Sequence, residues 1–268
     1  MTIQQLASQV KSKLEKDDNM TTKNTTNTSS PIQQLKALGF SNEIQAEPRR
    51  IILSLSGKEK TGKTHFSFTA PDPIFLFNID IGTEGVIGKF QREGKQIYSY
   101  DIRVRKGEKQ EIYQTMWADL RTRLAIACKV GEGTIVFDTA SEVYELARLA
   151  HFGKLSEVKP HHYGEVNGIW REMMRVVYDS TMNAIFIHKV KPKWENNIRT
   201  KEYEVAGFSD TGYMVQVNAT MLKERKPDGE GVDFSLSIDN CRKPPELEGM
   251  VLRGEMCNFE MLLGLVHD

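Results

Sequence analysis

The chain contains 268 residues, and 36 lysine and arginine side chains balance 36 aspartate and glutamate side chains, so the formal net charge is zero. This balance excludes a global positive field as the means of binding nucleic acid or membrane, and any polyanion site must come from local clustering. Three widely spaced cysteines without a C-x-x-C pair argue against a disulfide framework or a zinc site and fit a reducing compartment.

The sequence shows neither an apolar run of the ~20 residues that a membrane span needs nor a signal-peptide core at its start. We therefore expect a cytoplasmic protein with no membrane partner. Residues 1–16 are predicted to form an amphipathic helix, and residues 17–46 a flexible linker and a short helix, because residues 17–31 are almost entirely polar. Residues 47–268 are predicted to form one domain. The helical stripe of the first segment contains Ile3, Leu6, Val10 and Leu14.

A phosphate-binding motif follows the first apolar strand, which is predicted over residues 51–55. The motif is G-x-x-x-x-G-K-T, formed by Gly57, Lys58, Glu59, Lys60, Thr61, Gly62, Lys63 and Thr64. Its glycines let the backbone wrap a phosphate and point N–H groups inward. Lys63 is predicted to reach the β- and γ-phosphates and Thr64 to ligate Mg²⁺. We count His65, the next residue, among the nucleotide-contacting residues. The motif predicts ATP and Mg²⁺ as cofactors.

Strands and helices alternate after this motif. Apolar strands are predicted over 74–79, 97–102, 134–138 and 184–188, and helices over 108–129, 141–152 and 166–179. This alternation predicts an α/β domain with a mostly parallel sheet and helices on both faces. Residues 203–223 and 232–238 are expected to form antiparallel strands, and 259–266 a closing helix, that extend or cover one edge of the sheet.

The carboxyl ends of these strands provide the remaining chemistry, because ligands of open α/β sheets bind at that edge. Asp138 ends an apolar strand and is predicted to hold the Mg²⁺ shell through water. Glu84 and Glu142 compete for the role of the residue that activates the attacking water. Thr139, and not a glutamate, follows Asp138, which favours Glu84. His188 ends a strand, and we leave open whether it is a polar sensor or a packed residue.

These motifs together resemble the RecA-type recombinase core, through GKEKTGKT, the turn Thr83-Glu84-Gly85 and IVFDT without a following glutamate. The stretches DTASEVYELARLAHFGK and HHYGEVN resemble phage-encoded RecA-like ATP-binding proteins, some of which anneal single-stranded DNA. The resemblance covers residues 50–268 and implies a RecA-like ATPase domain. The spacing from Asp80 to Glu84 is longer than in recombinases, and a histidine stands at position 188 where they commonly carry an amide.

The resemblance also implies the roles of single residues. Lys63 and Thr64 match the residues that bind phosphate and Mg²⁺ in the family. Asp138 matches the carboxylate of the family's second nucleotide-binding motif, at the end of a strand. Glu84 matches the catalytic glutamate, and His188 matches the polar residue that senses the nucleotide at the end of the next strand. It implies an ATP-hydrolysing protein that acts on single-stranded DNA in phage recombination, annealing or repair, in the host cytoplasm. Self-association into a ring or filament is expected, because such cores take a cation from a neighbour. A phage or host single-strand-binding protein is a further expected partner.

Two segments are predicted to contact DNA. Residues 188–203 carry five cations against Glu195 and Glu202, which leaves 5 − 2 = +3, with Trp194 and Tyr203 interleaved. Cations that follow phosphates and aromatics that stack on bases hold single strands without sequence preference. The second segment offers Lys154, Lys159 and Tyr163. Solvated surface turns are the alternative for both. The cations of the first segment are Lys189, Lys191, Lys193, Arg199 and Lys201.

Two other functions are compatible with the motifs. A small-molecule or nucleotide kinase uses the same phosphate loop and would transfer phosphate to a substrate. A non-catalytic single-strand-binding protein would use ATP only as a conformational switch. Release of free phosphate would indicate an ATPase, and a phosphorylated product would indicate a kinase. Tight ATP binding without turnover would indicate a protein that ATP only switches.

Overall fold

The computed structural model describes residues 30–43, 47–79, 81–83, 85–105, 107–154, 162–196, 198–226 and 229–267. The chain divides into two units, residues 1–47 and 48–268, and each is described by itself. The helix predicted over residues 1–16 lies outside the described residues. Within the described parts of the chain, no helix is both long and apolar enough to span a membrane.

The first unit contains α2 (Pro31–Ala37), in the segment where a short helix was predicted. A capping box starts it: the Gln33 N–H donates to Ser30 Oγ over 3.3 Å, and the Ser30 N–H donates to Gln33 Oε1 over 2.9 Å. No residue of this helix is buried, and its apolar side chains Ile32 and Leu35 are exposed. The capping box therefore explains why α2 forms although none of its side chains is buried.

The second unit is built on an eight-stranded sheet in the order β10-β9-β8-β1-β5-β4-β2-β3. Every pairing from β8 across to β3 is parallel, whereas β9 and β10 are antiparallel. The predicted fold class, an α/β RecA-like core with an antiparallel C-terminal extension, is confirmed. The strands are β1 (Ile52–Ser56), β2 (Ile74–Asn78), β3 (Ile97–Asp101), β4 (Thr134–Asp138), β5 (Asn183–Ile187), β8 (Val217–Arg225), β9 (Val232–Cys241) and β10 (Val251–Arg253).

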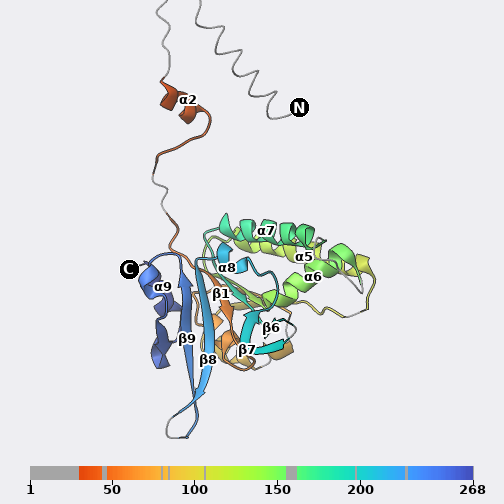
Figure 1. Ribbon diagram of the computed structural model, residues 1–268, viewed down its shortest axis with the longest axis vertical. Helices are drawn as coiled ribbons and strands as arrows, with labels where there is room; N and C mark the ends of the chain where they lie inside the picture. The colour runs from red at the N-terminus through yellow and green to blue at the C-terminus, as the bar shows by residue number, and fades with distance from the viewer. Residues whose placement is uncertain are drawn as a thin grey trace, which may run out of the picture. The chain divides into compact units, whose positions relative to one another are not determined.

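Helices cover both faces of this sheet, as Figure 1 shows for α5, α6 and α7 on one side and α9 beside β9. One apolar core lies under α5, α6 and α7 and includes Trp170, and the other includes Phe66 and Phe259 under α3 and α9. All residues of β1, β4 and β5 are buried, as expected for central parallel strands. The helices are α3 (Lys63–Ser67), α4 (Val86–Arg92), α5 (Gln110–Cys128), α6 (Ala140–Phe152), α7 (Tyr163–Tyr178), α8 (Thr211–Met214) and α9 (Phe259–His267).

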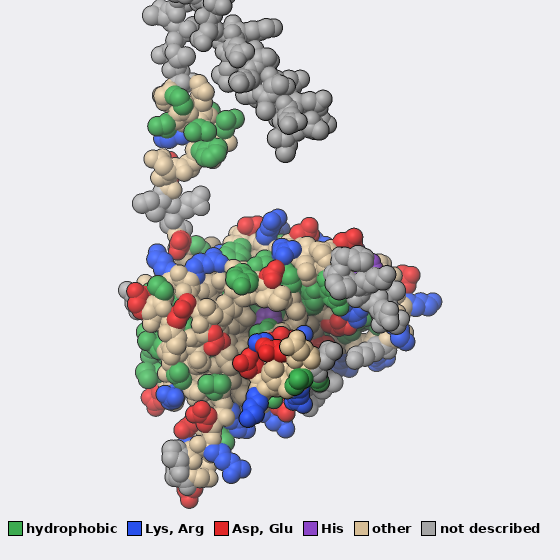
Figure 2. Space-filling model, in the orientation of Figure 1, with side chains coloured by type: hydrophobic (Ala, Val, Ile, Leu, Met, Phe, Trp, Pro, Cys, Tyr) green, Lys and Arg blue, Asp and Glu red, His purple; other side chains and the backbone are tan. Residues whose placement is uncertain are grey.

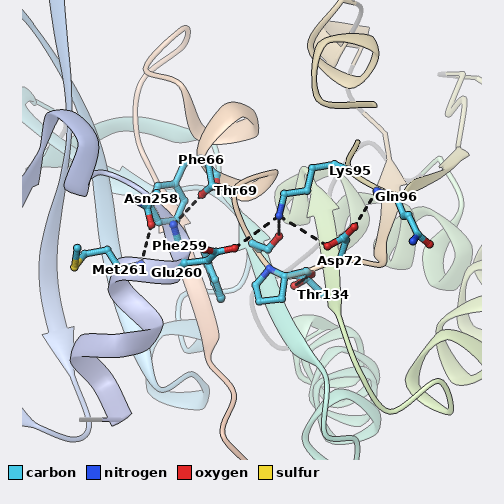
Figure 3. Close-up of polar contacts among 12 residues, drawn as sticks. Phe66, Thr69, Asp72, Lys95, Gln96, Thr134, Asn258, Phe259, Glu260 and Met261 are labelled. Carbon is cyan, nitrogen blue, oxygen red and sulfur yellow. Dashed lines mark hydrogen bonds and ion pairs between the residues drawn. The ribbon is translucent and has the colours of Figure 1, made fainter. Parts of the chain in front are cut away.

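The C-terminal helix is tied to the connection that follows α3 (Figure 3). The Phe259 N–H donates to Thr69 Oγ1 over 2.8 Å, and Lys95 Nζ lies 3.8 Å from Glu260 and 4.0 Å from Asp72. Lys95 also donates to the Ala70 carbonyl over 2.9 Å. These contacts join α9 to the connection between α3 and β2, close to the helix that follows the phosphate loop.

Three parts of the structure differ from the sequence-based expectation. Helix α4 was not predicted, because its seven residues are too few for a helical period to stand out. The stretch predicted as antiparallel strand over 203–223 is interrupted by α8. Its second half, β8, pairs parallel with β1 on one side and antiparallel with β9 on the other. Strand pairing is non-local, so the sequence pattern could not assign that partner.

A separate two-stranded hairpin lies outside the main sheet. It consists of β6 (Val190–Glu195) and β7 (Ile198–Val205), and it follows directly after β5. A turn around Asn196, whose φ is +50°, joins its strands. The predicted loop or hairpin over 188–203 is therefore a hairpin.

Candidate nucleotide and DNA site

The phosphate loop occupies the gap between β1 and α3, and two glycines make its path possible. Gly57 has φ of +147°, and a Cβ there would lie 2.7 Å from the Met221 carbonyl oxygen and 2.9 Å from Thr61 Oγ1. Gly62 has φ of +87° and precedes α3. Both positions need glycine, because a side chain would collide at the first and be strained at the second. The backbone can therefore close tightly around an anion.

The Lys63 side chain reaches back to the carbonyls at the start of this loop. Its Nζ donates to the Gly57 carbonyl over 2.8 Å and to the Lys58 carbonyl over 2.6 Å. Thr61 Oγ1 donates to the same Lys58 carbonyl over 2.9 Å. The ammonium is thus held at the mouth of the loop, where a phosphate oxygen would replace the two carbonyls as its partner.

The metal-binding residues predicted from the sequence are brought together. Thr64 Oγ1 donates to Asp138 Oδ2 over 2.6 Å, and Asp138 is only 3% exposed. A hydroxyl and a carboxylate are hard oxygen donors, and Mg²⁺ is held by few protein ligands together with waters and phosphates. The donor set therefore fits Mg²⁺, with Thr64 and Asp138 as the residues that would hold it.

A cavity of about 710 Å³ opens beside these residues. This volume is in the usual range for small-molecule sites. All eight residues of the phosphate loop line it. Its other walls include His65, Val86, Asp138, Thr139, Lys189 and Tyr203. The cavity thus joins the phosphate loop, the second-motif carboxylate and the base of the β6–β7 hairpin.

His65 borders this cavity next to α4. Its Nε2 lies 3.2 Å from Lys89 Nζ, and its ring meets Phe90 edge to face with centroids 4.8 Å apart. Burial lowers the pKa of His65, and the nearby Lys89 charge lowers it further. The ring is therefore neutral near pH 7 and offers an uncharged wall to a nucleotide.

His188 is 1% exposed and is not among the described residues that line the cavity. Burial lowers its pKa to about 4, and the Ala206 backbone opposes this shift only in part. Its main-chain N–H donates to the Leu55 carbonyl over 2.8 Å. Of the two roles that the sequence left open, the packed neutral residue is the one that this geometry favours.

Of the two glutamates that compete for water activation, one contacts a residue that lines the cavity. Glu142 lies in the first turn of α6, and its Oε1 accepts from Lys189 Nζ over 2.8 Å. Its carboxylate is therefore engaged by a cation that lines the cavity. The other, Glu84, lies outside the described residues.

The predicted DNA-contacting cations of the hairpin differ in their partners. Lys191 forms an ion pair with Glu204 at 3.1 Å, and Lys193 forms ion pairs with Glu195 and Glu202, both at 2.9 Å. Over residues 189–205, five cations face three acids, so the excess is 5 − 3 = +2 and is smaller than residues 188–203 suggested. Figure 2 shows acidic and basic side chains intermingled over the hairpin.

Arg199 and Lys201 remain as exposed cations that form no ion pair with any described residue. Trp194 is 62% exposed, and Tyr203 is also exposed while it contributes to the cavity wall. In the second predicted segment, Lys154 is exposed and Tyr163 packs partly against the core under α7. Lys159 lies outside the described residues, so this segment cannot be assessed as a DNA-binding surface.

Sequence reasoning missed two relationships at the site. Lys58 Nζ lies 4.3 Å from the centre of the Tyr203 ring, so the phosphate loop contacts the hairpin directly. Lys189, predicted to bind DNA, lines the cavity beside the phosphate loop. Its position two residues after β5 is the signal that could have indicated this, because that strand ends at the ligand-binding edge of the sheet.

The match to a known domain family agrees with a nucleotide-binding core. No curated protein matches the chain. Among solved structures, the chain is similar to the KaiC-like protein PH0186 from the hyperthermophilic archaeon Pyrococcus horikoshii OT3. The TM-score is 0.43 at 13% identity, over 77% of this chain and 85% of that one. Residues 49–221, more than half of the chain, match the AAA domain family AAA_24, and the chain therefore belongs to this family of P-loop ATPase domains.

Proposed function

We propose that the chain is an ATP-hydrolysing protein that binds single-stranded DNA through its β6–β7 hairpin, in phage recombination, annealing or repair. The family supports ATPase chemistry. The observation that carries the DNA part is a division of the hairpin into two unlike faces, one of which runs from the nucleotide cavity toward the tip.

The pairing register defines these faces. Trp194 pairs with Arg199, and Pro192, two residues earlier on β6, pairs with Tyr203. Paired residues and residues two apart on a strand share a face. The first face thus combines Trp194, Arg199 and Tyr203, and it contains none of the ion pairs found among the described residues of the hairpin.

The opposite face carries the ion pairs. Lys191 pairs with Glu204 across the strands, and Lys193 lies between Glu195 and Glu202. Its cations are already neutralised, so it offers little net charge to a polyanion. The aromatic face combines stacking platforms with Arg199, and aromatics interleaved with cations are the usual means of holding single-stranded nucleic acid. We therefore assign single-strand binding to the aromatic face.

The ATP site would act through the residues already described. Lys63 exchanges the loop carbonyls for phosphate oxygens, and Thr64 and Asp138 position the metal ligand sphere. When bound, Mg²⁺ neutralises charge that develops on the transferred phosphoryl group. Glu84 is the proposed water-activating residue, with Glu142 as the alternative. ATP and Mg²⁺ are thus the proposed cofactors, and self-association and a single-strand-binding partner remain proposals.

Phosphate release with and without an unstructured oligodeoxythymidine tests this function, with Lys63→Ala as the inactive control. DNA-stimulated release that the variant lacks is the expected result. Phosphorylated product without free phosphate would indicate a kinase instead. Tight ATP binding with negligible turnover, together with DNA binding, would indicate an ATP-switched binding protein. Absence of DNA binding in every nucleotide state would refute the assigned substrate.

A further inference from the structure

Lys189 occupies a position between the two nucleotide motifs. The sheet order places β5 between β1, which leads into the phosphate loop, and β4, which ends at Asp138. Lys189 lies two positions beyond the end of β5 and lines the same cavity as Asp138 and Thr139. Its side chain therefore enters the site on the side where Asp138 would organise the metal.

The main chain of Lys189 is held by hydrogen bonds on both sides. Its N–H donates to Ser141 Oγ over 3.0 Å, and its carbonyl accepts from the Ala206 N–H over 2.8 Å. Ser141 Oγ in turn donates to the Ala206 carbonyl over 2.7 Å. The backbone is thereby anchored to α6 and to the end of β7, so a change of partner would involve only the four-carbon side chain.

One partner of the Lys189 ammonium is the Glu142 carboxylate, which a phosphate could replace. Nζ lies 2.8 Å from Glu142 Oε1, and both side chains remain partly exposed. Exposed ion pairs of this kind contribute only about 0–1 kcal/mol. A triphosphate carries several negative charges, and charge-assisted hydrogen bonds to phosphate are the strong ones. The nucleotide would therefore compete well for this cation.

We propose that Lys189 is a γ-phosphate-binding residue supplied in cis, which leaves Glu142 when ATP enters the cavity. The inference rests on the proposed ATP-binding function and deepens it. A cation at the γ-phosphate stabilises the charge that develops there during transfer. Lys189 would thus supply from the same chain a cation that was expected from a neighbouring subunit. This role assigns Lys189 to the nucleotide site and no longer to the DNA-binding surface.

The test compares nucleotides that differ only in the γ-phosphate. Affinities for ADP and for a non-hydrolysable ATP analogue are measured by calorimetry with Mg²⁺ and without nucleic acid. Lys189→Met is expected to weaken binding of the analogue about tenfold, with ADP affinity within twofold of wild type, because a charged hydrogen bond to one phosphate is removed. Lys189→Arg should restore most of the preference for the analogue.

Two further variants distinguish phosphate binding from a structural role. Glu142→Gln removes the competing partner, so it should strengthen binding of the analogue a fewfold while Lys189→Met weakens it. Lys191→Met is the matched control, since this lysine is also ion-paired in the hairpin but is not among the described cavity residues. It should leave both affinities unchanged.

Equal losses for ADP and the analogue in Lys189→Met, or no loss for either, would overturn the inference. So would a weakening by Glu142→Gln that matches that of Lys189→Met, because an ion pair that only supports the fold predicts the same sign for both. Wild-type protein that binds neither nucleotide would refute the ATP site itself. A lack of DNA binding leaves this measurement unaffected, so the two failures are distinguishable.

Discussion

Thr64 and Asp138 are 74 positions apart in the chain, and the hydroxyl of the first donates to the carboxylate of the second over 2.6 Å. This contact joins the phosphate loop to the end of β4 across the intervening strand β5. It places the two oxygen donors that fit Mg²⁺ at one point beside the cavity. The catalytic predictions depend on this arrangement.

Asp138→Asn keeps the size of the side chain and removes its charge. Mg²⁺-dependent ATP hydrolysis is expected to fall about 10- to 100-fold, as for other groups that orient a metal ligand sphere. Steady-state phosphate release at several Mg²⁺ concentrations measures this effect. Asp119→Asn, an exposed carboxylate on α5 that pairs with Arg123, serves as the control and should match wild type. Full activity of Asp138→Asn at low Mg²⁺ would contradict the assignment.

Glu84→Gln should retain ATP binding and lose hydrolysis, because an amide keeps the shape of the side chain but cannot accept the proton of water. Glu142→Gln should keep most of the turnover, since Glu142 is not among the described residues that line the cavity and Glu84 is the residue proposed to activate water. Single-turnover hydrolysis combined with nucleotide affinity separates the two variants. The opposite pattern of losses would assign water activation to Glu142.

Trp194→Ala should weaken binding of single-stranded DNA about five- to hundredfold, since stacking contributes roughly 1–3 kcal/mol per base. Fluorescence anisotropy with a labelled oligodeoxythymidine measures this. Ile198→Ala is the matched control, because Ile198 is 70% exposed at the same end of the hairpin and pairs with Glu195 on the opposite face. Equal losses in both variants would argue against the aromatic face as the binding surface.

The two groups of hairpin cations should differ in their effect on salt dependence. Arg199→Ala with Lys201→Ala should flatten the slope of log affinity against log salt by about 0.7 for each phosphate that these cations no longer neutralise. Lys191→Ala with Lys193→Ala should change it less, because both lysines are ion-paired to hairpin acids. Anisotropy titrations between low and moderate salt provide the slopes. A larger effect in the second pair would mean that DNA displaces the acids.

His188 should make stability depend on pH. Its pKa is lowered to about 4 by burial, so the unfolded chain binds a proton that the folded chain does not between about pH 6.5 and pH 4. His188 therefore does not lower the free energy of unfolding above about pH 6.5, and it lowers it progressively as the pH falls toward 4. His188→Gln should reduce the loss of stability between pH 7 and pH 5, measured by urea unfolding. An unchanged loss would show that other groups account for it.

Several features of the site could be read from the sequence because their signals are local. Two glycines and a lysine at fixed spacing define the phosphate loop, and an apolar run that ends in Asp138 defines β4. The same local reasoning could have found the hairpin faces in part, since Tyr203 alternates with Glu202 and Glu204. What it could not supply was the pairing of Trp194 with Arg199, because the register shifts between Pro192 and Trp194.

The sequence by itself determined the chemistry of the nucleotide site and the alternation of strands and helices, because loop conformation and side-chain period depend on neighbouring residues. Only the tertiary structure decided the partners. It placed β5 between β1 and β4, buried His188 and aimed Lys189 at the cavity beside Glu142. These outcomes depend on which strands pair and on which side each strand is covered, and such contacts join residues far apart in the chain.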